Sequence, residues 1–166
     1  SGTTGRPVLV IGDSLTVGAG SSSNLDAQLR AQGWRPEIVA EEGASVGFGL
    51  DDVRLRSRVP AAVVVGLGTN PGPRPDDFAA DAASLVSELR LRGASTIVWI
   101  PPGDTEDEGR RERAAALREA TGPGLLVPDW PAELSRHPEL VGRDGIHLTD
   151  DGYGHLADFM VQALGT

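Results

Sequence analysis

The sequence predicts an α/β fold in which one parallel sheet carries helices on both faces. Short runs of β-branched and aliphatic residues alternate with longer amphipathic stretches, and this alternation occurs five times. The short runs are apolar at successive positions, as strands are when both faces of a sheet are covered. The chain has 166 residues, 39% of them hydrophobic, which suits a single packed core. We therefore expect one domain over residues 7–166, preceded by a disordered or expression-derived N-terminus at residues 1–6.

The strands are placed by short apolar runs rich in Val, Ile and Leu. Gly12 ends the first run and Pro101 ends the fourth, because neither residue continues a buried strand. The second run is brief and is typical of an edge strand. The five expected strands are residues 8–11, 37–40, 62–65, 96–100 and 125–127.

The helices are placed by caps, breakers and apolar spacing. Ser22 or Ser23 is expected to cap the first helix, which Gly33 stops. Thr149 or Asp150 is expected to cap the last. The five expected helices cover residues 23–32, 51–58, 76–93, 106–120 and 150–164.

Composition and charge exclude several classes of protein. The chain has 15 basic and 24 acidic residues, and its net charge of −9 argues against nucleic-acid binding and against docking on an anionic membrane. Cysteine is absent, which excludes disulfides, thiol nucleophiles and cysteine-based zinc sites. The apolar runs are far shorter than the ~20 residues of a membrane helix, so we expect no membrane contact by this domain. The oligomeric state is left open.

The loops that follow the strands are where a parallel sheet of this kind binds its ligands. Ser14 comes directly after the first strand in Gly-Asp-Ser-Leu, at residues 12–15. A serine at such a turn can expose its hydroxyl as a nucleophile. The same residues also fit a plain helix cap, in which Asp13 or Ser14 satisfies backbone N–H groups.

A serine nucleophile needs a base, and His147 is the best candidate among three histidines. Asp144 stands three residues before it and can bond its Nδ1–H, which turns Nε2 toward the serine. By contrast, His137 is expected to be a loop residue, and His155 an ordinary residue on the surface of the last helix.

The third strand is followed by Asn70, whose side-chain amide can donate to an oxyanion. Pro71 favours an extended backbone at Asn70, which helps to fix its side chain. The alternative is that the Asn-Pro pair is only a turn signal. Gly43, in the loop after the second strand, is expected to offer a backbone N–H beside Ser14.

Ser45 is a second nucleophile candidate, because residues 43–47 match Gly-x-Ser-x-Gly, the nucleophile elbow of α/β-hydrolases. We rank it below Ser14. The chain is short for that fold, it has no His-Gly-Gly-Gly-type oxyanion loop, and the strand before Ser45 is brief.

Four motifs together resemble the SGNH, or GDSL, hydrolase family. They are Gly-Asp-Ser-Leu at 12–15, Gly43, Gly-Thr-Asn at 68–70 and Asp-Gly-Ile-His at 144–147. Their order and separations match, and they span nearly the whole chain. The resemblance implies a three-layer, flavodoxin-like sandwich with strand order 2-1-3-4-5. Many members have Asp where this chain has Pro71, which puts substrate detail in doubt.

The same resemblance implies roles for single residues. Ser14 would be the nucleophile, with His147 and Asp144 as its partners. The backbone N–H groups of Ser14 and Gly43 and the amide of Asn70 would form the oxyanion hole. No metal or organic cofactor is implied.

In finer detail, the sequence looks like small bacterial esterases and the extracytoplasmic catalytic domains of cell-wall O-acetyltransferases. Asp129-Trp130 ahead of the 144–147 motif contributes to this likeness, although Trp130 can equally be a core residue at the end of the last strand. The likeness favours an extracytoplasmic or secreted, bacterial-type location.

We therefore expect a serine ester hydrolase that acts through an acyl-enzyme on short-chain, acetyl-like esters of small molecules or carbohydrates. An acyltransferase to a sugar or other alcohol is the first alternative, and a non-catalytic flavodoxin-like binding module is the second. The acidic residues within 104–108 can suggest a metal site, but a solvated helix start explains them better.

Overall fold

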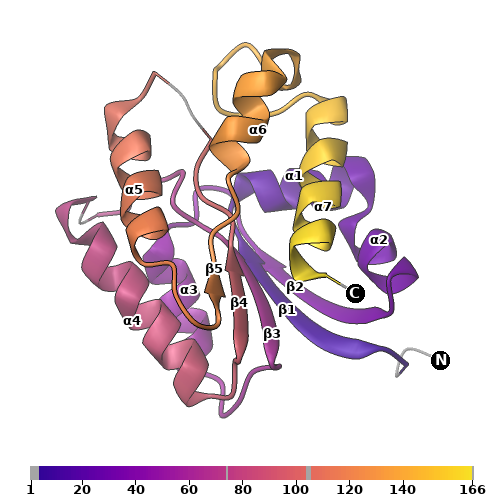
Figure 1. Cartoon of the computed structure of the whole chain (residues 1–166), viewed down its shortest axis with the longest axis vertical. Coiled ribbons are helices and arrows are strands. Elements are labelled where there is room, and N and C mark those ends of the chain that lie inside the picture. Colours follow the sequence, from indigo (N-terminus) through magenta and orange to yellow (C-terminus); the bar gives the residue numbers. More distant parts are fainter. Residues whose placement is uncertain (1–3, 74, 104–105, 166) are drawn as a thin grey trace.

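A five-stranded parallel sheet organises the computed structural model, which describes residues 4–73, 75–103 and 106–165. Its strand order is β2-β1-β3-β4-β5, as the family resemblance implies (Figure 1). All four strand pairings are parallel. The strands are β1 (Arg6–Gly12), β2 (Trp34–Ala40), β3 (Ala62–Gly66), β4 (Thr96–Trp99) and β5 (Leu125–Leu126).

Helices cover both faces of this sheet and give a three-layer sandwich (Figure 1). α3, α4 and α5 pack on one face, and α1, α2, α6 and α7 pack on the other. The helices of the described residues are α1 (Ser14–Ser23), α2 (Leu25–Ala31), α3 (Val46–Arg54), α4 (Phe78–Leu91), α5 (Glu108–Glu119), α6 (Trp130–Arg136) and α7 (Asp150–Leu164), with 3₁₀ turns η1 (Pro75–Asp77) and η2 (Pro138–Leu140). Within the ranges described, none of these helices is long and apolar enough to cross a membrane.

Alternate residues of each central strand face opposite layers, which explains why the strands are apolar throughout. In β1, Leu9 and Ile11 pack in the core under α3 and α4, whereas Val8 and Val10 pack in the core under α1 and α7. All four are at most 1% exposed. Trp99, which is fully buried, donates its indole N–H to the Leu67 carbonyl at 2.8 Å.

The ordered sheet begins at Arg6, which is paired with Trp34 at the start of β2. The Arg6 guanidinium lies 4.0 Å above the centre of the Trp34 ring. Residues 1–3, which belong to the N-terminal segment expected to be disordered, lie outside the described residues.

The structure has two helices where the sequence predicts one. The helix predicted over residues 23–32 is α2, capped by Asn24 and not by Ser22 or Ser23, and α1 before it was not predicted. α1 begins at Ser14, and Asn24, in the left-handed region at φ 51°, ends α1 and caps α2. The stretch from residue 17 to 23 has no apolar stripe, so its sequence gives no helix signal. Gly18 explains the packing instead, since a Cβ there would lie 2.2 Å from the Tyr153 ring on α7.

Two further boundaries differ from the prediction. α3 begins at Val46, not at residue 51. The segment 129–147, expected to be a loop, contains α6 and η2. Asp129 caps α6 by accepting the Ala132 N–H at 3.1 Å, and proline lies in the first turn, as is common at helix starts. β2 is an edge strand as predicted, but it is not brief, since it begins at Trp34 and has seven residues. The remaining strands and helices lie where the sequence places them, to within a few residues.

Candidate functional site

Ser14 and His147, which are far apart in sequence, meet at the carboxyl end of the sheet. Ser14 is the first residue of α1, directly after β1, and His147 lies in the loop before α7. The Ser14 Oγ is 3.2 Å from the His147 Nε2. This distance is within hydrogen-bond reach, as a serine and its base require.

The start of α1 combines a helix cap, Asp13, with the candidate nucleophile, Ser14. Asp13 is the N-cap, and its Oδ1 accepts the Leu15 N–H at 3.0 Å. The helix-cap interpretation of Asp13 is therefore confirmed, while Ser14 remains turned toward the histidine. The backbone N–H groups of a helix's first turn have no intrahelical partner, so they favour an anion beside Ser14.

Asp144 orients the histidine through three contacts. Its Oδ2 is 2.6 Å from His147 Nδ1, and its Oδ1 accepts the N–H groups of Ile146 and His147 at 2.9 and 2.8 Å. These bonds lower the pKa of Asp144 from 3.8 to about 2, with the imidazole as the main cause. An ionised carboxylate on Nδ1 keeps the proton there, so the lone pair of Nε2 faces Ser14.

The loop that carries this pair is tightly closed. Gly142 donates its N–H to the His147 carbonyl at 2.7 Å, and Val141 forms an antiparallel bridge with Leu148. Gly145 has a φ of 72°, which favours glycine at this turn. The imidazole is therefore positioned from both ends of a short loop.

Asn70 lies in the loop after β3, at the carboxyl end of the sheet where Ser14 and His147 meet. Its Nδ2 donates to the Ala44 carbonyl at 3.0 Å, which joins the loop after β3 to the loop after β2. An amide nitrogen has two hydrogens, so one remains for another acceptor. Gly43, next to Ala44, is exposed and has a φ of 77°.

Two arginines that sequence reasoning missed brace the loop before Asn70. The buried Arg113 donates from Nε to the Gly68 carbonyl at 2.6 Å and from Nη2 to the Thr69 carbonyl at 3.1 Å. Arg110 adds a bond to the Thr69 carbonyl at 3.2 Å. Both arginines are on α5, and their charge-rich surroundings in the sequence did not indicate which carbonyls they bind.

Asp13 has a second property that the sequence did not indicate. It is 1% exposed, and burial raises its pKa from 3.8 to about 6. Its Oδ2 has no hydrogen-bond partner among the residues described. With a pKa of about 6, this carboxyl titrates near pH 6, next to Ser14 in the chain.

Ser45, the competing nucleophile, precedes α3 and lies against the loop after β3. A Cβ built on Gly72 would be 3.0 Å from the Ser45 Oγ. Within the described ranges, no hydrogen bond joins Ser45 to a histidine, whereas Ser14 has one. The geometry therefore favours Ser14.

The surface beside Ser14 has a narrow cavity of about 10 Å³. That volume accommodates about one water molecule. Its lining is mainly apolar but includes Arg110, and it comes from α1, α6 and the loops that carry Asn70 and His147: Leu15, Thr69, Trp130, Leu134, Ile146 and Leu148. Trp130 is the first residue of α6, and its side chain is buried in the core, which confirms the simpler of its two interpretations.

His137 lies outside the regular helices and His155 lies on α7, as expected, but the two side chains are close together, which was not predicted. His137 and His155 lie with Glu133 in a cluster whose potential ligand atoms are all within 4.8 Å of one another. Sequence reasoning missed it because residues 130–136 were expected to be a loop, so the helical spacing of Glu133 and His137 was not recognised. The acidic cluster expected at residues 104–108 falls in part outside the described residues, since 104 and 105 are not described.

One curated protein is similar to the chain in sequence. The GDSL lipase Rv0518 from Mycobacterium tuberculosis is 29% identical over an alignment of 183 positions, which covers 92% of this chain and 79% of the lipase. No model of a known protein family matches the sequence.

Solved structures are similar in fold. The C-terminal catalytic domain of Streptococcus pneumoniae peptidoglycan O-acetyltransferase A matches with a TM-score of 0.80 and 24% identity, over 97% of this chain and 93% of that domain. A putative SGNH hydrolase from Slackia heliotrinireducens matches with a TM-score of 0.77 and 20% identity, over 97% and 100%. The resemblance read from the four motifs is thereby confirmed.

Proposed function

We propose that this chain, a homologue of a GDSL lipase with the SGNH-hydrolase fold, is a serine ester hydrolase that acts through an acyl-enzyme. The observation that carries the proposal is the continuous chain of contacts from Ser14 Oγ through the His147 imidazole to the Asp144 carboxylate. Nucleophile, base and orienting carboxylate are the parts that serine acyl transfer requires.

In the first half-reaction, Ser14 Oγ attacks the ester carbonyl while His147 Nε2 takes the hydroxyl proton. Asp144 stabilises the imidazolium that forms, and the imidazolium then protonates the leaving alcohol. In the second half-reaction, His147 takes a proton from water, and the resulting hydroxide attacks the acyl carbon. Collapse of that intermediate releases the carboxylic acid and returns the proton to Ser14.

The tetrahedral intermediate in each half-reaction carries a negative oxygen. The Ser14 N–H, the Gly43 N–H and the second amide hydrogen of Asn70 bind this oxygen. The bond from Asn70 to Ala44 fixes the amide against the residue that follows Gly43, which supports a shared role for these two donors. Hydrogen-bond donors that are oriented before the reaction stabilise the developing negative oxygen most, because they need not reorganise during acyl transfer.

The favoured substrates are acetyl or similarly short esters. The small cavity beside Ser14 has mainly apolar lining, which suits the methyl group of an acetyl ester. The fold likeness to a peptidoglycan O-acetyltransferase domain is consistent with an acetyl group and a carbohydrate alcohol.

Transfer of the acyl group to a sugar hydroxyl is the second candidate, and the same fold likeness favours it. The two functions share the acyl-enzyme and differ only in the acceptor. The exposure of the Asp144 and His147 side chains, 48% and 50%, leaves water access to the acyl-enzyme and places hydrolysis first.

The experiment is hydrolysis of p-nitrophenyl acetate, butyrate and octanoate by the wild type, Ser14→Ala and Ser45→Ala. We expect acetate to be the best substrate, with activity lost in Ser14→Ala and kept in Ser45→Ala. Addition of a sugar acceptor, with the products followed by mass spectrometry, separates hydrolysis from transfer. Equal ester hydrolysis by the wild type and Ser14→Ala would overturn the proposal.

A further inference from the structure

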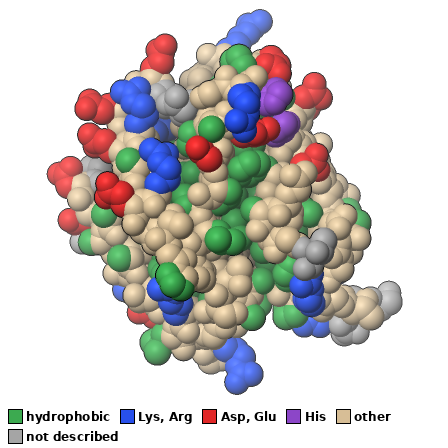
Figure 2. Space-filling view, in the orientation of Figure 1, with side chains coloured by type: hydrophobic (Ala, Val, Ile, Leu, Met, Phe, Trp, Pro, Cys, Tyr) green, Lys and Arg blue, Asp and Glu red, His purple; other side chains and the backbone are tan. Residues whose placement is uncertain are grey.

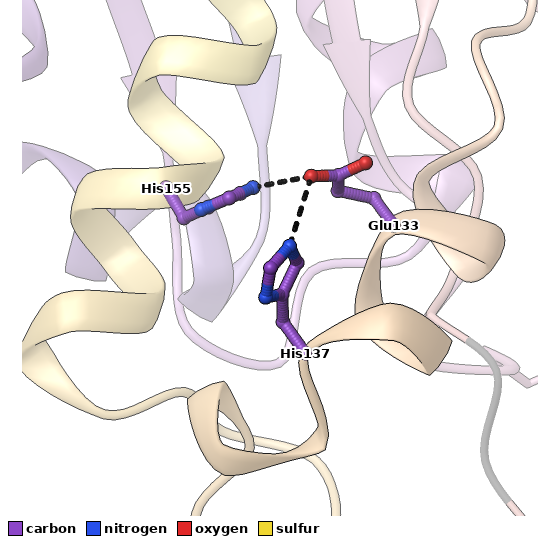
Figure 3. Close-up of side chains that lie close together, drawn as sticks. All are labelled: Glu133, His137 and His155. Atoms are coloured by element: carbon purple, nitrogen blue, oxygen red, sulfur yellow. Dashed lines mark hydrogen bonds and ion pairs between the residues drawn. The ribbon is translucent and has the colours of Figure 1, made fainter.

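A second group of reactive side chains lies between α6 and α7, apart from Ser14. Glu133 is on α6, His137 is at the end of that helix, and His155 is on α7 (Figure 3). The Glu133 Oε1 is 2.7 Å from His155 Nε2 and 3.8 Å from His137 Nε2. In Figure 3, both imidazoles point toward the same carboxylate oxygen.

Neighbouring residues hold two of the three side chains in this orientation. Arg136 donates to the other Glu133 oxygen, Oε2, at 2.7 Å. His137 Nδ1 faces the Glu139 carboxylate at 3.3 Å, so a proton on Nδ1 leaves the lone pair of Nε2 facing the cluster. A carboxylate behind a histidine is the arrangement that orients metal-binding imidazoles.

We propose that Glu133, His137 and His155 form a binding site for a divalent transition-metal ion of the zinc type. Two imidazole nitrogens and one carboxylate oxygen are ligands that Zn²⁺ prefers, and a fourth position remains for water. Tetrahedral zinc with ligands at about 2.0–2.1 Å places those ligands about 3.3 Å apart. The separations of the two imidazole nitrogens from Glu133 Oε1, 2.7 and 3.8 Å, lie on either side of that value, and all three ligand atoms lie within 4.8 Å of one another.

An ion can reach this site from solution. The side chains of His137 and His155 are 41% and 33% exposed, and Figure 2 shows histidine side chains at the surface beside acidic ones. The net charge of −9 favours the approach of a cation. Binding displaces any proton held between Glu133 and His155, so affinity falls at acidic pH.

The position of this site links ion binding to the segment that carries Asp144 and His147. His137 and His155 enclose residues 138–154, the segment that carries Asp144 and His147. An ion bound by both histidines joins the two ends of this segment and restricts its local opening. Any effect of this restriction on ester hydrolysis rests on the proposed function, whereas ion binding itself does not.

The test is isothermal titration of the purified chain with ZnCl₂, together with visible absorption of the Co²⁺-loaded protein. We expect one ion per chain and the absorption bands of tetrahedral Co²⁺. His137→Gln, His155→Gln and Glu133→Gln should each lower affinity by at least about 100-fold, and Glu139→Gln by about 10-fold through the orientation of His137.

His147→Ala is the matched control, because it removes a histidine outside the cluster, and it should bind the ion as the wild type does. Circular dichroism confirms that each variant is folded. Three results would overturn the proposal: no binding by the wild type at 100 μM Zn²⁺, binding unchanged in folded His137→Gln and His155→Gln, or binding lost in His147→Ala. None of these depends on esterase activity, so the proposed function is tested separately.

Discussion

Burial of Asp13 makes the stability of the protein depend on pH. Its folded-state pKa is about 6, against 3.8 in the unfolded chain, because burial disfavours the charged form. The stability that the neutral carboxyl contributes is therefore fully present below pH 3.8 and is lost as the pH rises through 6. At about 1.4 kcal/mol per pKa unit, the full difference is about 3 kcal/mol, of which about 2 kcal/mol falls between pH 4 and 7.

Asp13→Asn removes this dependence and keeps a side-chain oxygen for the Leu15 N–H, since asparagine is also a good N-cap. The assay is urea unfolding at pH 4, 5, 6 and 7, followed by tryptophan fluorescence. The free energy of unfolding of the wild type should fall by about 2 kcal/mol more than that of Asp13→Asn across this range. Identical pH profiles for the two proteins would refute the reasoning, whatever their absolute stabilities.

Three further substitutions test the site. Asn70→Ala should lower kcat for p-nitrophenyl acetate by about 10²–10³-fold; a kcat within threefold of the wild type would remove Asn70 from the oxyanion hole. Asp144→Asn should lower kcat by about 10⁴-fold in a protein that still folds, because the imidazole loses its fixed tautomer; a loss confined to KM would contradict this role. Arg113→Met leaves the Gly68 and Thr69 carbonyls without these bonds. It should cost about 1–3 kcal/mol in urea unfolding and also lower kcat, so unchanged stability would show that the bonds are dispensable.

The sheet could be predicted from the sequence because its signal is local. Runs such as 62–65 are apolar at every position, and burial on both faces of a parallel sheet requires this. The strand order came only from the family resemblance, since apolar runs do not say which strands are neighbours. α1 was missed because its glycine-rich sequence is helical through contact with α7, a long-range effect that no local pattern reports.

The meeting of Ser14 with His147 could be predicted because each residue lies in a motif at a strand or helix end. Contacts that single residues make from distant helices could not be predicted in this way. Arg113 reaches the Asn70 loop across the fold. Its spacing from Leu117 places it on the inner face of α5, but that spacing does not say which carbonyls it binds. The grouping of His155 with Glu133 likewise depends on how α6 packs on α7.

The identity of the nucleophile is the central claim, and covalent labelling tests it most directly. The wild type, Ser14→Ala and Ser45→Ala are treated with a fluorophosphonate, and the adducts are measured by intact mass and located by peptide mapping. The account predicts one adduct, on Ser14, in the wild type and in Ser45→Ala, and none in Ser14→Ala. An adduct on Ser45, or labelling of Ser14→Ala equal to that of the wild type, would contradict it.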